Sequence, residues 1–318
     1  MRGVFLDLDT VSHQGDVELS PLRQALKELR SFGTTPTAQV IERVGDAEVV
    51  IINKVKLDAS ILSHLTRTRL ISVAATGTNS VDLEAALNHG IAVCNVPAYS
   101  TRSVVQHMFA FILTLTQHLK EYEILLQQGA WHRAPQFNLL DYPIRELAGK
   151  QLGILGYGDI GKAVAKVAEA FGMQVLIGAR NAEDKRSGRL AIKELLPQVD
   201  VLTIHVPLLP ETRNLIGSGE LALMKHDALL INCARGGIVD EQALADALKS
   251  GKLGGAGIDV LSEEPPVHGN PLLAPGIPNL IVTPHIAWTT REARQRVIVE
   301  MALNIEAFKK GEKRNRVA

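Results

Sequence analysis

Three polar side chains in the second half of the chain have types that suit proton and charge chemistry on a carbonyl compound. Each follows a strand-like apolar run: Arg235 in Ile-Asn-Cys-Ala-Arg-Gly-Gly, Glu264 in Asp-Val-Leu-Ser-Glu-Glu-Pro-Pro and His285 in Val-Thr-Pro-His-Ile-Ala-Trp. An arginine fork can hold a carboxylate or polarise a carbonyl. A histidine can exchange a proton near neutral pH, and a carboxylate bonded to it orients the ring. Taken singly, each residue has an ordinary alternative as a surface ion pair, a solvated loop residue or a backbone hydrogen-bond partner.

The stretch from Leu152 to Gly161 has the spacing of a dinucleotide-binding turn. It places G-x-G-x-x-G directly after a strand-like segment, and a helical pattern follows as far as Gly172. In such a turn the glycines allow a sharp bend, close approach of a pyrophosphate and close helix–strand packing. The spacing alone is weak evidence against a purely structural turn, and the strand–turn–helix setting strengthens it. We expect cofactor contacts at Gly156, Tyr157, Gly158, Asp159, Ile160 and Gly161.

The next strand-like run lacks the acid that NAD binding usually requires. That acid lies about 20 residues after the glycines and accepts a hydrogen bond from the ribose 2′-hydroxyl. Here no acidic residue occurs between Glu169 and Glu183, and the expected strand end reads Val-Leu-Ile-Gly-Ala-Arg-Asn, with Ala179 followed by Arg180. Loss of the carboxylate removes repulsion against a 2′-phosphate, and an arginine can pair with that phosphate. We therefore expect NADP(H) to be favoured, with NAD(H) possible. The alternative is that the basic residues of this segment form a solvated loop.

Composition excludes several classes of function. Among 318 residues, 34 Lys and Arg balance 34 Asp and Glu, so the chain carries no electrostatic footprint for nucleic acid or an anionic membrane. The two cysteines, Cys94 and Cys233, do not make a disulfide framework. The start MRGVFLDLDT lacks the apolar core of a signal peptide, and no apolar stretch is long enough to span a bilayer. We expect a cytoplasmic protein, and no spacing of ligand residues indicates a metal site.

Strand-like and helix-like segments alternate in two series, which predicts an α/β protein with two parallel-sheet domains, Rossmann-like or flavodoxin-like. Two helices are expected beside them, one at Pro21–Leu29 with Ser20 as N-cap and a long one from Arg102 to about Gln128. Ligands bind outside the carboxyl ends of such strands, so an active-site cleft between the domains is expected. The expected strands are Gly3–Leu8, Glu48–Ile52, Leu70–Ala75, Ile91–Asn95, Gln151–Leu155, Gln174–Gly178, Val201–His205, Leu229–Asn232, Gly255–Asp259 and Leu280–Thr283, before a last helix from about Thr290 to Lys310.

The order of these motifs resembles the D-isomer-specific 2-hydroxyacid dehydrogenases over nearly the whole chain. The segments at 99–107, 53–55 and 285–288 are most similar to the glycerate dehydrogenase (hydroxypyruvate reductase) group of that family. The resemblance implies a discontinuous substrate domain, residues 1–100 and 286–318, and a dinucleotide-binding domain, residues 101–285. It also implies a homodimer formed through the second domain, with the helix from Arg102 and the loop at 131–142 as candidate contacts.

The resemblance implies roles for individual residues. Arg235 would bind the substrate carboxylate and carbonyl, His285 would be the general acid and base, and Glu264 rather than Glu263 would be its partner. The backbone of the loop at 75–78 would hold the carboxylate, unless that loop is an ordinary turn, and Trp288 would line the pocket or pack in the core. The expected substrate-binding residues are Asn53, Lys54, Ala75, Thr76, Gly77 and Trp288. We predict further cofactor contacts at His205, Val206, Pro207, Thr212, Cys233, Ala234, Asp259 and Ala287.

The activity expected from the resemblance is reduction of a small 2-oxo acid, hydroxypyruvate or glyoxylate, to the D-2-hydroxy acid, D-glycerate or glycolate, with NAD(P)H. Two alternatives stay open at this stage. One is a dehydrogenase for bulkier 2-oxo acids, or of the phosphonate or formate type, on the same scaffold. The other is a dinucleotide-sensing binding protein that resembles the corepressor relatives of the family.

Overall fold

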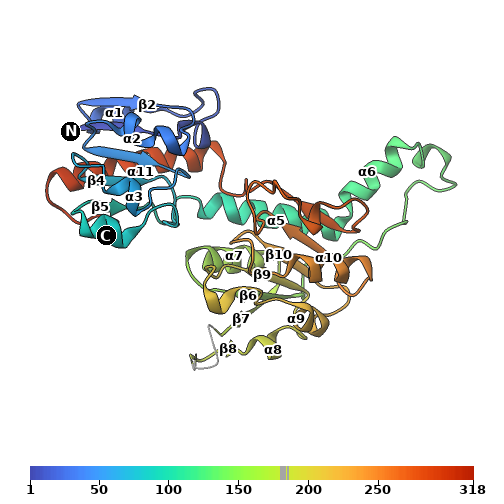
Figure 1. Ribbon diagram of the computed structural model, residues 1–318. Helices are drawn as coiled ribbons and strands as arrows, with labels where there is room; N and C mark the ends of the chain where they lie inside the picture. The colour runs from blue at the N-terminus through green and yellow to red at the C-terminus, as the bar shows by residue number, and fades with distance from the viewer. Residues whose placement is uncertain (180–183, 185) are drawn as a thin grey trace. The chain divides into compact units, whose positions relative to one another are not determined.

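The computed structural model describes residues 1–179, 184 and 186–318, which form two compact units (Figure 1). Unit 1 comprises Met1–Ser100 and Trp288–Ala318, and unit 2 comprises Thr101–Ala287. Each unit contains one sheet whose strand pairs are all parallel, which confirms the expected α/β class. Within the described ranges, no helix is both long and apolar enough to cross a membrane.

Unit 1 is built on a five-stranded sheet of order β2-β1-β3-β4-β5. Strands β3 and β4 are buried along their whole length, as expected for parallel strands covered on both faces. The C-terminal helix α11 packs against α1 and β4, so the two chain segments of unit 1 share one core. The elements of this unit are β1 (Arg2–Phe5), η1 (Leu8–Thr10), α1 (Ser20–Ala25), β2 (Glu28–Ser31), η2 (Thr37–Gln39), α2 (Val40–Val44), β3 (Val49–Ile52), α3 (Ala59–Leu62), β4 (Leu70–Val73), α4 (Leu83–Asn88), β5 (Ala92–Cys94) and α11 (Arg291–Lys309).

Unit 2 is built on a seven-stranded sheet of order β12-β11-β10-β9-β6-β7-β8. The chain order reverses at β6, which lies between β7 and β9, and this switch point is where doubly wound sheets bind ligands. The elements are α5 (Thr101–Gln117), α6 (Leu119–Gln127), η3 (Trp131–Arg133), β6 (Gln151–Leu155), α7 (Asp159–Ala170), β7 (Gln174–Gly178), β8 (Arg189–Leu190), α8 (Ile192–Leu195), β9 (Val201–Ile204), η4 (Pro210–Thr212), α9 (Ser218–Leu223), β10 (Leu229–Asn232), α10 (Glu241–Lys249), β11 (Gly255–Ile258), η5 (Pro271–Leu273) and β12 (Leu280–Val282).

The structure differs from the sequence expectation at two edge strands. The helix expected at Pro21–Leu29 ends at Ala25, and Ser20 is its first residue rather than its N-cap. Residues Glu28–Ser31 instead form β2, which pairs with β1 along its full length. Strand β8 is likewise absent from the expected strands. Both strands are short, lie at sheet edges and carry polar residues, so an apolar pattern does not reveal them.

The prediction of a single long helix from Arg102 to about Gln128 is also wrong, because the structure has two helices there, α5 and α6. The backbone of His118 takes a left-handed conformation, φ 51° and ψ 41°, which separates α5 from α6. Just before the break, the Thr116 hydroxyl donates to the Ile112 carbonyl, a contact that tends to bend helices. As a result α6 and the loop that follows it project from the end of α5, away from the sheet of unit 2 (Figure 1).

Candidate active site

A histidine and a carboxylate that the sequence singled out are hydrogen-bonded in unit 2. The Nδ1 atom of His285 lies 2.6 Å from Oε2 of Glu264, and Oε1 of Glu264 accepts from the Leu261 amide at 2.9 Å. Because a carboxylate accepts, Nδ1 carries the hydrogen and Nε2 is the nitrogen left to exchange a proton. Both side chains are partly exposed, so this nitrogen can meet a ligand.

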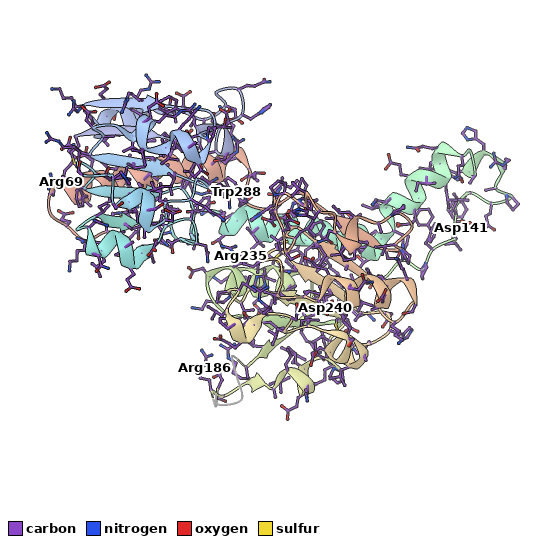
Figure 2. The ribbon with its side chains drawn as sticks, viewed as in Figure 1. Arg69, Asp141, Arg186, Arg235, Asp240 and Trp288 are labelled. Carbon is purple, nitrogen blue, oxygen red and sulfur yellow. The ribbon has the colours of Figure 1, made fainter. Side chains whose placement is uncertain are left out.

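The turn that carries Arg235 packs directly on the loop that carries Glu264. The side chain of Asn232, at the end of β10, accepts from the Ala234 amide and donates to the Arg235 carbonyl, which shapes the turn. A Cβ at Gly236 would overlap the backbone of Leu261, so only glycine allows this approach. Arg235 is exposed at the carboxyl edge of the sheet (Figure 2). The fold thus brings Arg235 beside the loop of the Glu264–His285 pair.

Asp259, which directly follows β11, binds the backbone of the two residues after His285. Its side chain is 1% exposed, and its two oxygens accept from the amides of Ile286 and Ala287 at 2.8 and 2.9 Å and from the Thr283 hydroxyl at 2.5 Å. The half-buried Cys233 lies near this carboxylate. Burial, and secondly the charge of Asp259, raise the pKa of the Cys233 thiol, so the sulfur stays protonated and is not a nucleophile at neutral pH.

The glycine-rich turn has the shape that a dinucleotide requires. Gly156 has φ 97°, and a Cβ there would lie 2.7 Å from the carbonyl carbon of His205, so the turn fits tightly against the end of β9. A Cβ at Gly161 would overlap the Gly156 carbonyl oxygen, whereas at Gly158 nothing lies within 4 Å. Gly158 caps α7 without a side chain, so the helix N–H groups face this open space and fit a pyrophosphate. Asp159 and Ile160 begin α7.

The residues after β9 form the opposite wall of that turn. The Nε2 atom of His205 is buried and has no hydrogen-bond partner among the described residues. Burial lowers the pKa of His205 to about 4, so the ring is neutral at pH 7. Val206 packs against the core of unit 2. The Thr212 hydroxyl donates to the Pro207 carbonyl at 2.7 Å, which closes the loop. Among the remaining expected cofactor contacts, Ala234 packs against the core and Ala287 is buried.

The segment expected to distinguish the two nicotinamide cofactors follows β7. Ala179 is half-buried, and its amide donates to the Leu190 carbonyl of β8 at 2.7 Å. The guanidinium carbon of Arg189 lies 5.0 Å above the ring of Tyr157, which places a cation beside the glycine turn. Arg186, beside β8, forms a bidentate pair with Asp184 (Figure 2). Arg180 and Lys185 lie outside the described residues.

In unit 1, a buried carboxylate that was not among the predicted site residues organises the loop at 53–55. Asp7 is 3% exposed and accepts from the backbone amides of Asn53, Lys54 and Val55 at 2.6 to 3.1 Å. The Asn53 side chain donates to the Thr10 hydroxyl at 3.0 Å, while Lys54 is exposed. An acid inside the expected apolar strand Gly3–Leu8 was the available signal for Asp7.

The other expected substrate-binding residues also belong to unit 1. Ala75, Thr76 and Gly77 follow β4, where the Thr76 hydroxyl donates to the Val96 carbonyl at 2.9 Å. Trp288 packs against the core of unit 1 and meets the Tyr99 ring edge-on at 6.1 Å. The structure therefore places the expected substrate-binding residues in unit 1 and the expected acid–base residues in unit 2. In the described parts of both units, no group of three or more His, Cys, Asp or Glu suits a metal ion.

Comparison with known proteins gives similarity over most of the chain. Residues 109–287 match the family model described as D-isomer specific 2-hydroxyacid dehydrogenase, NAD binding domain. The chain is 45% identical to a glycerate dehydrogenase of Methylorubrum extorquens, over 91% of each chain. It is 40% identical to a hydroxypyruvate reductase of Blautia hydrogenotrophica, over 87% of each chain. Among solved structures, an acyclic imino acid reductase in complex with NADPH and D-Arg is similar over the whole of both chains, with a TM-score of 0.86 and 27% identity.

Proposed function

Because the chain belongs to the D-isomer specific 2-hydroxyacid dehydrogenase family and is therefore an oxidoreductase, we propose that it reduces hydroxypyruvate or glyoxylate to the D-2-hydroxy acid. The observation that carries this proposal is the 2.6 Å bond between His285 and Glu264, with the Arg235 turn packed on the same loop. A proton donor, its orienting carboxylate and a carboxylate-binding cation are the protein groups that such a reduction needs.

The proposed reaction adds a hydride and a proton across the carbonyl. The glycine turn at 156–161 would hold the nicotinamide dinucleotide, which would supply the hydride. His285 donates the Nε2 proton to the carbonyl oxygen, and Glu264 stabilises the charged imidazole and fixes its orientation. Arg235 binds the substrate carboxylate and favours the developing charge on the oxygen. Under this proposal unit 1 is the substrate domain, and its loops at 53–55 and 75–78 stay the predicted substrate-binding segments.

The cofactor is a nicotinamide dinucleotide, since residues 109–287 match the NAD binding domain of the family. We propose that NADP(H) is preferred over NAD(H). Two observations support this: Ala179 stands where an acid would bind the 2′-hydroxyl, and the Arg189 guanidinium lies over Tyr157 of the glycine turn. A 2′-phosphate at this place would meet a cation rather than a carboxylate, which favours it electrostatically.

We expect rapid oxidation of NADPH with hydroxypyruvate, and a smaller kcat/KM with NADH. Replacing Ala179 with Asp should reverse the order, since the new carboxylate repels a 2′-phosphate and accepts from a 2′-hydroxyl. The measurement is loss of nicotinamide absorbance for both cofactors and both proteins, with Ala179→Asn as the uncharged control. Preference for NADH by the unmodified protein would contradict the proposed NADP(H) preference but not the proposed reduction of 2-oxo acids. No turnover with hydroxypyruvate, glyoxylate or bulkier 2-oxo acids would contradict the enzymatic proposal.

We also propose that the protein is a homodimer held through unit 2. The support comes from α6 and the loop to residue 144, which we name the arm; in Figure 2 Asp141 marks it. All residues of α6 are at least partly exposed. The arm is held by its own contacts, such as the Trp131 indole on the Phe137 carbonyl. Its apolar side chains stand exposed, Phe137 at 87% and Leu140 at 75%. Apolar surface of this kind usually marks an interface, and a second copy offers the same surface.

Replacing Phe137 and Leu140 together with Ser should shift the protein from dimer to monomer, because the change removes apolar contact area at side chains that stand exposed on their own chain. Light scattering coupled to size-exclusion chromatography measures the mass. Leu87→Ser is the control, since Leu87 is 61% exposed on α4 of unit 1. A monomeric unmodified protein, or dissociation by the Leu87 variant instead, would contradict an interface at the arm.

A further inference from the structure

Two polar side chains of α5 contact the segment that carries His285. The Ser103 hydroxyl, on a residue 4% exposed, donates to the Ala287 carbonyl at 2.6 Å. One helical turn later, Nε2 of His107 lies 3.0 Å from the Thr283 hydroxyl. Residues four apart lie on the same face of a helix, so α5 contacts the segment at both of its ends. Neither residue was among those expected from the sequence to form the site.

The direction of the hydrogen bonds between His107 and Asp259 follows from their chemistry. The Thr283 hydroxyl has one hydrogen and gives it to Oδ1 of Asp259 at 2.5 Å, because a carboxylate only accepts. The hydroxyl oxygen therefore accepts from His107, whose hydrogen lies on Nε2. Burial lowers the pKa of His107, against the opposing effect of Asp259, whose carboxylate is 3.7 Å away. The neutral His107 ring packs edge-on against Phe111, 4.5 Å between centroids, which fixes its orientation.

The segment at 283–287 contains a backbone conformation that requires support from surrounding contacts. His285 has φ 55°, a left-handed conformation that few residues other than glycine adopt. Such a backbone persists where the surroundings over-determine it. Here Asp259 binds the amides on the C-terminal side of His285, Thr283 fixes the N-terminal side, and Ser103 binds the Ala287 carbonyl. Glu264 fixes the orientation of the His285 ring, while these contacts fix the position of the His285 backbone.

We propose that Ser103 and His107 are positioning residues for His285, acting through Thr283, Asp259 and Ala287. The consequence for the reaction rests on the proposed function, because it assumes that His285 donates the proton. The His107–Thr283 contact supports Asp259 and the backbone of His285, so its loss displaces the proton donor but removes no group predicted to contact the substrate or the dinucleotide. Proton transfer is sensitive to displacements of about 1 Å, which can cost a factor of roughly 100 in rate.

The test uses pairs of variants that differ in one hydrogen bond. Thr283→Val removes the hydroxyl at nearly constant volume, and Thr283→Ser restores it. His107→Leu removes the donor, and His107→Gln keeps an N–H at a similar reach. We expect the T283V and H107L proteins to lose roughly 10- to 100-fold in kcat with little change in KM or in NADPH affinity. T283S and H107Q should recover most of kcat. Unchanged kcat in T283V, or equal loss in T283S, would overturn the proposal.

A second readout does not depend on turnover. The Nδ1 hydrogen of His285, held by Glu264, should give a downfield imidazole proton resonance, assigned by its absence in H285A. We expect T283V to shift or broaden that resonance and T283S to preserve it, with circular dichroism confirming that both proteins are folded. Failure of the unmodified protein to reduce any 2-oxo acid would refute the proposed function and leave this test intact. An unchanged resonance in T283V would refute the positioning role itself.

Discussion

Replacing His285 with Ala is expected to lower kcat for hydroxypyruvate reduction by roughly 100- to 10,000-fold at neutral pH, while NADPH affinity stays nearly unchanged. The ring is the proposed proton donor and is bonded to Glu264, so its removal takes away acid catalysis and leaves the glycine turn intact. Stopped-flow or steady-state absorbance gives kcat, and quenching of protein fluorescence by NADPH gives the affinity. Asp259 still holds the backbone of the segment in this variant, so a general loss of structure is not expected.

The chain contains a matched control for this experiment. His268 also pairs with a carboxylate: its Nδ1 atom lies 2.7 Å from Oε1 of Glu263. Its side chain is 84% exposed, on the loop between β11 and η5 that also carries Glu264. His268→Ala removes an exposed histidine–carboxylate pair, which contributes little, and should leave kcat at the unmodified value. Equal turnover of the His285→Ala protein and the unmodified protein would show that another group, or water, supplies the proton.

The sheets could be predicted from sequence where burial dominates. Strands β6 and β10 are largely buried and have the bounds expected from their apolar runs, Gln151–Leu155 and Leu229–Asn232. The more exposed β7 also has its expected bounds, Gln174–Gly178. Parallel strands covered on both faces have this near-continuous apolar pattern. Strands β2 and β8 and the break at His118 could not be predicted. The two strands depend on pairing with other strands, and the break depends on a local backbone conformation that no apolar pattern encodes.

The contact between Glu264 and His285 could be predicted from sequence, whereas the contacts that hold the backbone of His285 could not. Glu264 and His285 follow strands that end at one edge of a parallel sheet, so their position along the chain indicates their place in the fold. Ser103 and His107 contact residues 184 and 176 positions away, from inside a helix whose sequence pattern simply indicates a buried face. The available signal was the i, i+4 pair of polar residues on that apolar face, which the sequence alone does not connect to the segment at 283–287.

In both units a buried aspartate that follows a strand binds successive backbone amides of another segment. In unit 1, Asp7 follows β1 and binds the three successive amides of residues 53–55. In unit 2, Asp259 follows β11 and binds two successive amides after His285. A buried carboxylate that accepts several backbone N–H groups satisfies those donors and fixes a loop at the carboxyl edge of the sheet. The residues proposed to meet the substrate are therefore set by backbone contacts, which tolerate change in the exposed side chains.

Replacing Arg235 with Gln is expected to reduce kcat/KM for hydroxypyruvate by roughly 100- to 1,000-fold, because the substrate carboxylate and the developing oxyanion lose a charged donor. The Asn232 contacts to the turn involve backbone atoms of residues 234 and 235, so the turn itself should persist. Arg235→Lys should recover part of the loss, since lysine keeps the charge without the planar fork. Arg23→Gln, at an exposed arginine of α1, is the control for loss of one positive charge.

The role of Arg235 in binding the carboxylate can be isolated by comparing hydroxypyruvate with hydroxyacetone, in which a methyl group replaces the carboxylate. In the unmodified protein kcat/KM should favour hydroxypyruvate strongly. In the Arg235→Gln protein that preference should shrink by most of the factor lost with hydroxypyruvate, because the variant lacks the group that recognises the charge. If both substrates lose activity by the same factor, Arg235 acts on the carbonyl oxygen alone, and another group would have to recognise the carboxylate.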